Sequence, residues 1–65
     1  MTKKGAILAM MTGRKVTHRF FSPDEWITME GNEMVLEDGV RCDPDEFWRW
    51  RILSGWEDGW SFYNE

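Results

Sequence analysis

The segment KKGAILAMMTGRKVTHRFF, residues 3–21, carries a helical pattern followed directly by a strand pattern. The apolar residues that recur at i, i+3 and i+4 spacing are Ala6, Ile7, Met10 and Met11. This spacing predicts a helix over residues 3–12, because such residues share one helix face. Thr2 can cap its start, and Gly13 follows its end, where glycine is favoured for its left-handed backbone.

Residues 14–21 alternate as a strand does. Val16, His18 and Phe20 are expected to point to one side, and the opposite side then carries Lys15, Thr17, Arg19 and Phe21. Because a helix and a strand follow one another without a linker, we expect a small α+β domain that spans residues 1–65.

Turn signals divide the middle of the chain. Residues 22–25, Ser-Pro-Asp-Glu, have the spacing of a capping box and predict a single helical turn. Residues 26–29 and 34–37 are short extended runs around Glu-Gly-Asn-Glu, which indicates an antiparallel hairpin. A second turn is expected at Asp38-Gly39.

A second helix is predicted from Pro44 to about Leu53, with Asp43 as its cap and Glu46 reaching back to the cap. It should end at Ser54-Gly55, and a last strand is expected over Trp60–Tyr63. The sheet is therefore expected to be short and antiparallel, with a strand from the end of the chain.

This second helix is apolar on two sides. On a helical wheel, one stripe holds Phe47, Trp48 and Ile52, and the other holds Trp50 and Leu53. A helix of this kind must bury both sides, and a second subunit, a ligand or the C-terminal strand are the candidates to cover the outer one. Aromatic residues are frequent anchors of interfaces, so we predict a homo-oligomer. The predicted interface residues are Trp48, Trp50, Leu53 and Trp56.

The residue counts exclude several kinds of site. Cys42 is the only cysteine and His18 the only histidine of the 65 residues. An internal disulfide is therefore impossible, and we expect no metal site and no cofactor. The chain has no glycine-rich phosphate loop and no nucleophile motif, so we expect a binding protein rather than an enzyme.

The charges are unevenly distributed along the chain, whose net charge is −4. Residues 1–21 hold five basic residues and no acid, whereas residues 22–65 hold all twelve acids and three arginines. The acidic excess argues against duplex DNA, whose phosphates require many cations. The basic segment either pairs with the acidic half or binds a small anion, and the sequence leaves both possibilities open.

No segment of the sequence points to a membrane or to export. The apolar run 6–11 is shorter than the ~20 residues of a membrane span. It is followed by Thr-Gly-Arg-Lys, which lacks the small residues of a signal-peptide cleavage site. A cytoplasmic protein with a free Cys42 is therefore expected.

Several of these elements resemble a group of small bacteriophage proteins, the Thoeris anti-defense sponge family. The similar elements are the apolar helix, Gly13-Arg14-Lys15-Val16, the aromatic Phe21 and the final Trp60-x-Phe62-Tyr63. The chain departs from the family pattern at His18, Phe21 and Gly59, where the family has Arg, Trp and Asp. The resemblance implies an oligomeric α+β protein that traps cyclic nucleotide immune signals in the bacterial host cell without cleaving them.

Two kinds of partner follow from this reading. A nucleotide needs aromatic planes for its base and Arg or Lys for its phosphate. The predicted ligand-binding residues are Arg14, His18, Arg19, Phe21, Trp26 and Trp60. The alternative is an inhibitor of a host defense protein, in which the segment 30–46, with seven of the twelve acids, mimics nucleic-acid charge or covers a basic groove. The direction in which these acids point discriminates between the two readings.

Overall fold

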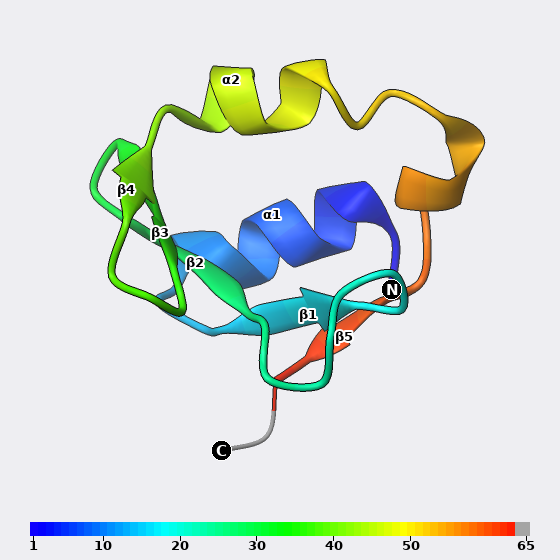
Figure 1. Ribbon diagram of the computed structural model, residues 1–65, viewed down its shortest axis with the longest axis horizontal. Helices are drawn as coiled ribbons and strands as arrows, with labels where there is room; N and C mark the ends of the chain where they lie inside the picture. The colour runs from blue at the N-terminus through cyan, green and yellow to red at the C-terminus, as the bar shows by residue number, and fades with distance from the viewer. Residues whose placement is uncertain (64–65) are drawn as a thin grey trace.

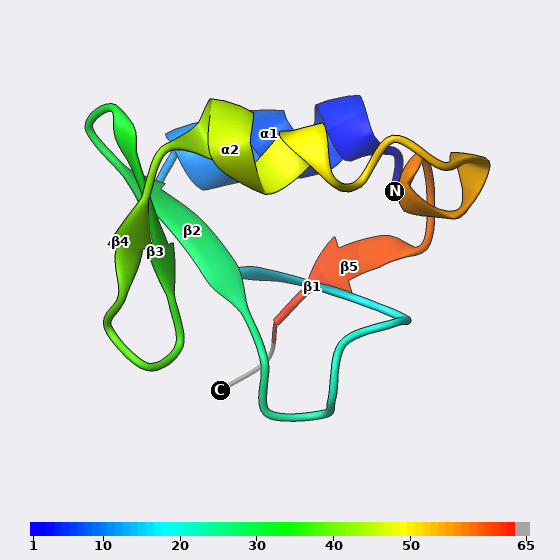
Figure 2. The same cartoon turned by 45° about the horizontal axis from the view of Figure 1, so that its top comes forward.

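One antiparallel sheet and two helices make up the backbone, as a computed structural model describes it for residues 1–63 (Figure 1). The strands are β1 (Val16–His18), β2 (Ile27–Glu30), β3 (Glu33–Leu36), β4 (Arg41–Cys42) and β5 (Trp60–Phe62). The helices are α1 (Lys3–Met11) and α2 (Pro44–Arg49), and a 3₁₀ turn, η1, covers Ser54–Trp56. The strand order is β4-β3-β2-β1-β5, and both helices lie on one side of the sheet (Figures 1 and 2). The predicted α+β class is confirmed.

Helix α1 begins at the predicted residue and ends one residue earlier than predicted, at Met11. The Thr2 side chain accepts a hydrogen bond from the Gly5 backbone N–H at 3.1 Å. At the other end, the Gly13 N–H donates to the Met10 carbonyl oxygen at 2.9 Å, and Gly13 has a φ of 87°. That left-handed conformation turns the chain directly into β1, because glycine adopts it without steric cost. Ala6 and Met10, four residues apart, are buried against the sheet.

Strand β1 is shorter than the predicted strand over residues 14–21. Val16 and His18 are both buried on the helix side, as the alternation predicts. The strand ends at His18 because its carbonyl oxygen accepts the Phe21 N–H at 2.9 Å, which closes a turn. Phe20 therefore lies outside the strand and is exposed, contrary to its predicted place beside Val16 and His18.

The predicted hairpin is confirmed in β2 and β3, whose strands pair from Ile27 with Leu36 to Glu30 with Glu33. The chain then turns at Asp38-Gly39, as expected, and adds β4. This two-residue strand was not predicted, since a run of only two residues has no alternation to detect.

Helix α2 ends at Arg49, so the prediction that it continues to Leu53 is wrong. In a continuing helix, the Phe47 carbonyl oxygen would accept the Arg51 N–H. Here that N–H bonds the Trp48 oxygen at 3.0 Å, and the Arg51 side chain donates to the Phe47 oxygen at 3.0 Å instead. Arginine often satisfies the last carbonyls of a helix in this way. The second apolar stripe predicted for this helix is not formed, because Trp50 and Leu53 both lie beyond its end.

Strand β5 brings the end of the chain beside β1. Its register pairs Trp60 with His18 and Phe62 with Val16. Trp60 is only 2% exposed, and its indole N–H donates to the Trp56 carbonyl oxygen at 2.8 Å. The buried core consists of Ala6, Met10, Val16, Ile27, Met34, Phe47 and Trp60. Within residues 1–63, no helix has the length and apolar character needed to cross a bilayer.

Candidate functional site

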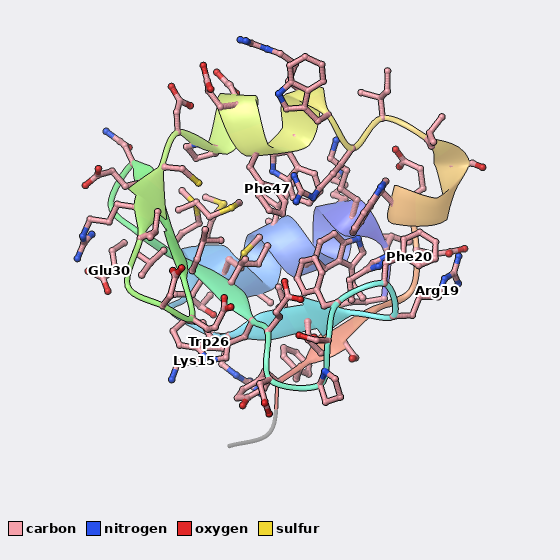
Figure 3. The ribbon with its side chains drawn as sticks, viewed as in Figure 1. Lys15, Arg19, Phe20, Trp26, Glu30 and Phe47 are labelled. Atoms are coloured by element: carbon pink, nitrogen blue, oxygen red, sulfur yellow. The ribbon has the colours of Figure 1, made fainter. Side chains whose placement is uncertain are left out.

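Two cations rest on aromatic rings at the start of β1. The Arg14 Cζ atom lies 4.0 Å from the centre of the Phe62 ring. The Lys15 ammonium lies 4.3 Å from the centre of the Trp26 ring, and Figure 3 shows these two side chains together. Both distances are within the ~6 Å range of cation–π attraction. Positive charge and aromatic surface are therefore combined at one end of the strand.

Hydrogen bonds from three elements fix the backbone that carries these cations. The Arg14 N–H donates to the Ala9 oxygen at 3.2 Å, and the Arg14 oxygen accepts from the Thr28 hydroxyl at 2.8 Å. The Lys15 oxygen accepts the Tyr63 N–H at 3.0 Å. Helix α1, strand β2 and the residue after β5 thus hold this short segment in place. A ligand that binds here meets a preformed backbone.

A second aromatic ring extends the surface around Lys15. The Trp26 and Tyr63 rings are 6.3 Å apart and tilted by 46°. Because side chains alternate along a strand, Lys15 and Trp26 point away from the face that buries their neighbours Val16 and Ile27. We call the group of Arg14, Lys15, Trp26, Phe62 and Tyr63 the cation–aromatic cluster. Phe62 pairs with Val16 and therefore points to the helix side, so Arg14 and Phe62 lie on one side of the sheet and Lys15, Trp26 and Tyr63 on the other.

Arg14 and Arg19, the two predicted phosphate contacts, lie at opposite ends of β1. Arg19 forms an ion pair with Asp58 at 3.3 Å, and both side chains are mostly exposed, so the pair contributes little to stability. Figure 3 shows Arg19 and Phe20 on the other side of the molecule from Lys15. In the part of the chain that the structure describes, no ion pair neutralises Arg14. The basic segment is therefore divided: Arg19 pairs with an acid of the second half, whereas Arg14 pairs with none of the acids within residues 1–63.

His18 and Trp60, two of the predicted ligand contacts, are buried in the core and are not accessible to a surface ligand. His18 is only 3% exposed. Its Nδ1 atom accepts the Phe20 N–H at 3.0 Å, so its Nε2 carries the hydrogen. Nε2–H donates to the Asp58 oxygen at 2.7 Å and approaches the Gly55 oxygen at 3.0 Å. The strand pattern placed His18 toward the core but did not predict that backbone groups would bond both of its ring nitrogens.

Gly59 and His18 are in close contact. Gly59 has a φ of 86°, and a Cβ atom added there would lie 3.1 Å from His18 Nε2. Because residues with a side chain rarely adopt this backbone, any residue other than glycine would be strained at position 59 beside His18. One local packing arrangement therefore involves both residues.

The predicted interface residues separate into two groups. Trp48 and Trp56 pack against the core, where Trp48 lies 5.4 Å from the Trp60 ring. Trp50 and Leu53 are 77% and 74% exposed. The structure does not bring the four together on one helix face, because the helix ends before Trp50.

Arg14 and Trp26 of the cluster were predicted as ligand contacts from the sequence. Phe62 and Tyr63 were not. Their place depends on the register of β5 against β1, which joins segments more than forty residues apart. An aromatic run at the end of a chain does not reveal its partner strand. The remaining predicted contact, Phe21, is half-buried and lines a pocket on the helix side of the sheet.

The described residues lack the usual groups for metal binding and hold a weakly nucleophilic thiol. Residues 1–63 hold no cluster of three or more His, Cys, Asp or Glu side chains suited to a metal. Burial raises the pKa of the Cys42 thiol, which keeps it protonated and weakly nucleophilic at neutral pH. Comparison with known proteins gives no match to a family model, to a curated protein or to a solved structure.

Proposed function

We propose that the protein is a non-catalytic binder that captures a small nucleotide at the cation–aromatic cluster. The observation that carries the proposal is that the Lys15 ammonium rests on the Trp26 ring beside Tyr63, while Arg14, the preceding residue, rests on Phe62 on the other side of the sheet. Nucleotides combine a flat base with a phosphate, and the side with Lys15, Trp26 and Tyr63 offers a cation and aromatic planes for these parts, with Arg14 as a second cation at the end of the strand.

The chemistry of the cluster matches both halves of such a ligand. Stacking a base on an aromatic side chain contributes about 1–3 kcal/mol of binding free energy, whichever base it is. Trp26 and Tyr63 offer such planes. Arg14 presents a planar fork for phosphate oxygens, whereas Lys15 supplies a point charge. No ion pair within residues 1–63 competes for Arg14, so a phosphate would not have to displace any of these acids from it.

Capture alone is sufficient for the proposed role. A binder present in excess of a signalling nucleotide lowers the free concentration by mass action, and no bond has to be broken. The resemblance to phage sponge proteins suggests an immune signal in the bacterial cytoplasm as the target. The assignment as a non-enzyme rests on the same proposal.

The directions of the acids favour nucleotide capture over nucleic-acid mimicry. Glu30 and Glu33 both pair with Arg41, at 2.8 Å and 3.7 Å. Asp43 caps α2 by accepting the Asp45 N–H, and other acids of the segment serve the Asp38 turn and the Glu46–Arg49 pair. A charge mimic requires a continuous acidic face, whereas these side chains bond locally at turns, caps and strand edges.

Binding to a host defense protein remains a second candidate because of the residues that follow α2. Trp50, Ile52 and Leu53 are all at least 74% exposed, whereas Arg51 between them points inward. Exposed apolar side chains next to one another are typical of interaction surfaces. This segment, rather than the acidic one, is where we would expect a protein partner.

Calorimetry with a panel of cyclic dinucleotides and cyclic ADP-ribose isomers tests the proposal. At least one compound should bind, and its affinity should fall as salt is added, because phosphate contacts are partly electrostatic. Native mass spectrometry of the protein recovered from bacteria would also reveal a nucleotide carried along. A panel without any binding isotherm would refute nucleotide capture and leave the protein-binding candidate first.

A further inference from the structure

A pocket of about 270 Å³ lies between α2 and the sheet, separate from the cation–aromatic cluster. Its lining residues are Phe21, Glu25, Ile27, Leu36, Glu37, Asp38, Phe47 and Arg51. Four of them are apolar, three are acids and one is a cation. Figure 3 shows Phe47 pointing from α2 toward the interior. Half of the lining residues are apolar and half are charged, so a ligand that matches the pocket must combine an apolar part with charged groups.

Arg51 is the cation of this pocket, and its position is unusual for arginine. Its Cζ atom lies 3.9 Å from the Phe47 ring centre and 5.3 Å from that of Trp56. The Nη1 atom donates to the Phe47 oxygen, but the shielded Nε atom has no hydrogen-bond partner within residues 1–63. Burial lowers the pKa of Arg51, although the group stays charged at neutral pH. The guanidinium therefore retains unused donor capacity.

Glu25 is the best-defined acid of the pocket. One of its carboxylate oxygens accepts from the Ser22 N–H at 2.9 Å and from the Ser22 hydroxyl at 2.8 Å. These bonds, together with the charge of Arg51, lower the pKa of Glu25 and keep it ionised. Nevertheless, no ion pair joins Glu25 to Arg51 in the described part of the chain. Opposite charges therefore line one pocket without forming a direct ion pair within the described residues.

We infer that this pocket binds a small zwitterion, with an ammonium and a carboxylate on a short apolar body, as in a free apolar α-amino acid. Three carboxylates against one guanidinium favour an ammonium and disfavour a phosphate. Arg51 is the group suited to the ligand's carboxylate, and Glu25 to its ammonium. The apolar body would contact Phe21 and Phe47. The volume is below the ~300–1,000 Å³ typical of larger ligands, which limits the size of the molecule.

The test is a titration of the ¹⁵N-labelled protein with leucine, methionine and phenylalanine, followed by amide chemical shifts. At least one amino acid should shift the amides of residues that line the pocket. Its amide derivative lacks the carboxylate, and its N-acetyl derivative lacks the ammonium, so both should bind at least about 10-fold more weakly. If no amino acid shifts these amides, or if all three forms bind equally, the inference is wrong.

Paired variants assign the ammonium contact. Glu25→Gln removes one charge from the pocket and should weaken the binding of the amino acid by about 10-fold or more. Asp24→Asn removes the same charge from the neighbouring exposed residue and should leave the affinity unchanged. An unchanged affinity in Glu25→Gln, with the native spectrum retained, would overturn the assignment. Nucleotide binding at Arg14 should be unaffected in both variants, so this inference and nucleotide capture can fail separately.

Discussion

The Nε2 atom of His18 lies 2.7 Å from the carbonyl oxygen of Asp58, and this bond ties β1 to the turn that precedes β5. The same ring accepts the Phe20 N–H through Nδ1, so it also shapes the loop that leaves β1. Aromatic rings surround it, with Trp56 at 4.4 Å and Trp60 at 4.6 Å between ring centres. The only histidine of the chain is therefore a structural connection between its two halves.

Replacing His18 by Phe should destabilise the fold by about 1–3 kcal/mol, because buried backbone groups would lose their partners while the aromatic packing largely remains. Urea unfolding followed by circular dichroism would measure the loss. The control is Arg19→Ala, which removes the exposed neighbour and should change stability by less than about 1 kcal/mol. Equal stability of His18→Phe and the native protein would show that these bonds contribute nothing.

Acidification should destabilise the fold partly through Glu25. The pKa of Glu25 is lowered from 4.5 in the folded state, chiefly by its hydrogen bonds to Ser22. Its contribution is therefore present above the unfolded-state pKa and is lost as the pH falls through the folded one. Melting temperatures between about pH 6 and pH 3 should fall less steeply in Glu25→Gln than in the native protein. Parallel curves would contradict this assignment, and Asp24→Asn serves as the control.

The exposed side chains after α2 should mediate self-association. Trp50 is 77% exposed, so Trp50→Glu should leave the melting temperature nearly unchanged. The native protein should show a mass above that of the monomer in sedimentation equilibrium at tens of micromolar, a range typical of moderate affinity. The variant should sediment as a monomer. A monomeric native protein, or a variant that assembles as before, would refute an interface at this segment.

Variants of the cation–aromatic cluster should separate nucleotide binding from stability. Arg14→Ala should lower the affinity for the nucleotide by about 10- to 100-fold, the range for hydrogen bonds to charged groups. Trp26→Ala should weaken it by a similar factor through lost stacking. Calorimetry would measure both, with Arg19→Ala as the matched control, because Arg19 lies at the other end of β1 and pairs with Asp58. A larger loss in Arg19→Ala than in Arg14→Ala would move the site to that end.

Local signals predicted those elements whose cause lies within a few residues. Helix α1 is fixed by a Thr2 cap, an apolar face and Gly13, all readable in the sequence. The β2–β3 hairpin follows in the same way from two extended runs around a turn. The end of α2 could not be predicted, because it depends on the Arg51 side chain turning inward to the Phe47 carbonyl.

The candidate site was predicted only in part, for a related reason. Arg14 and Trp26 are visible as a cation and an aromatic, but their partners come from the register between β1 and β5. That register places Phe62 beside Val16 and buries Trp60 beside His18. Long-range pairing of this kind leaves no local pattern. For this reason, sequence reasoning selected His18 and Trp60 as contacts although they are core residues.

Chemical-shift mapping of a bound nucleotide tests nucleotide capture most directly. ¹⁵N–¹H spectra would be recorded with each cyclic dinucleotide and cyclic ADP-ribose isomer. For at least one compound, the largest shifts should occur at the Arg14, Lys15 and Tyr63 amides and at the Trp26 indole N–H. If no compound shifts these signals, or if the shifts are confined to the Arg19–Phe20 end of β1, the cation–aromatic cluster is not a nucleotide site.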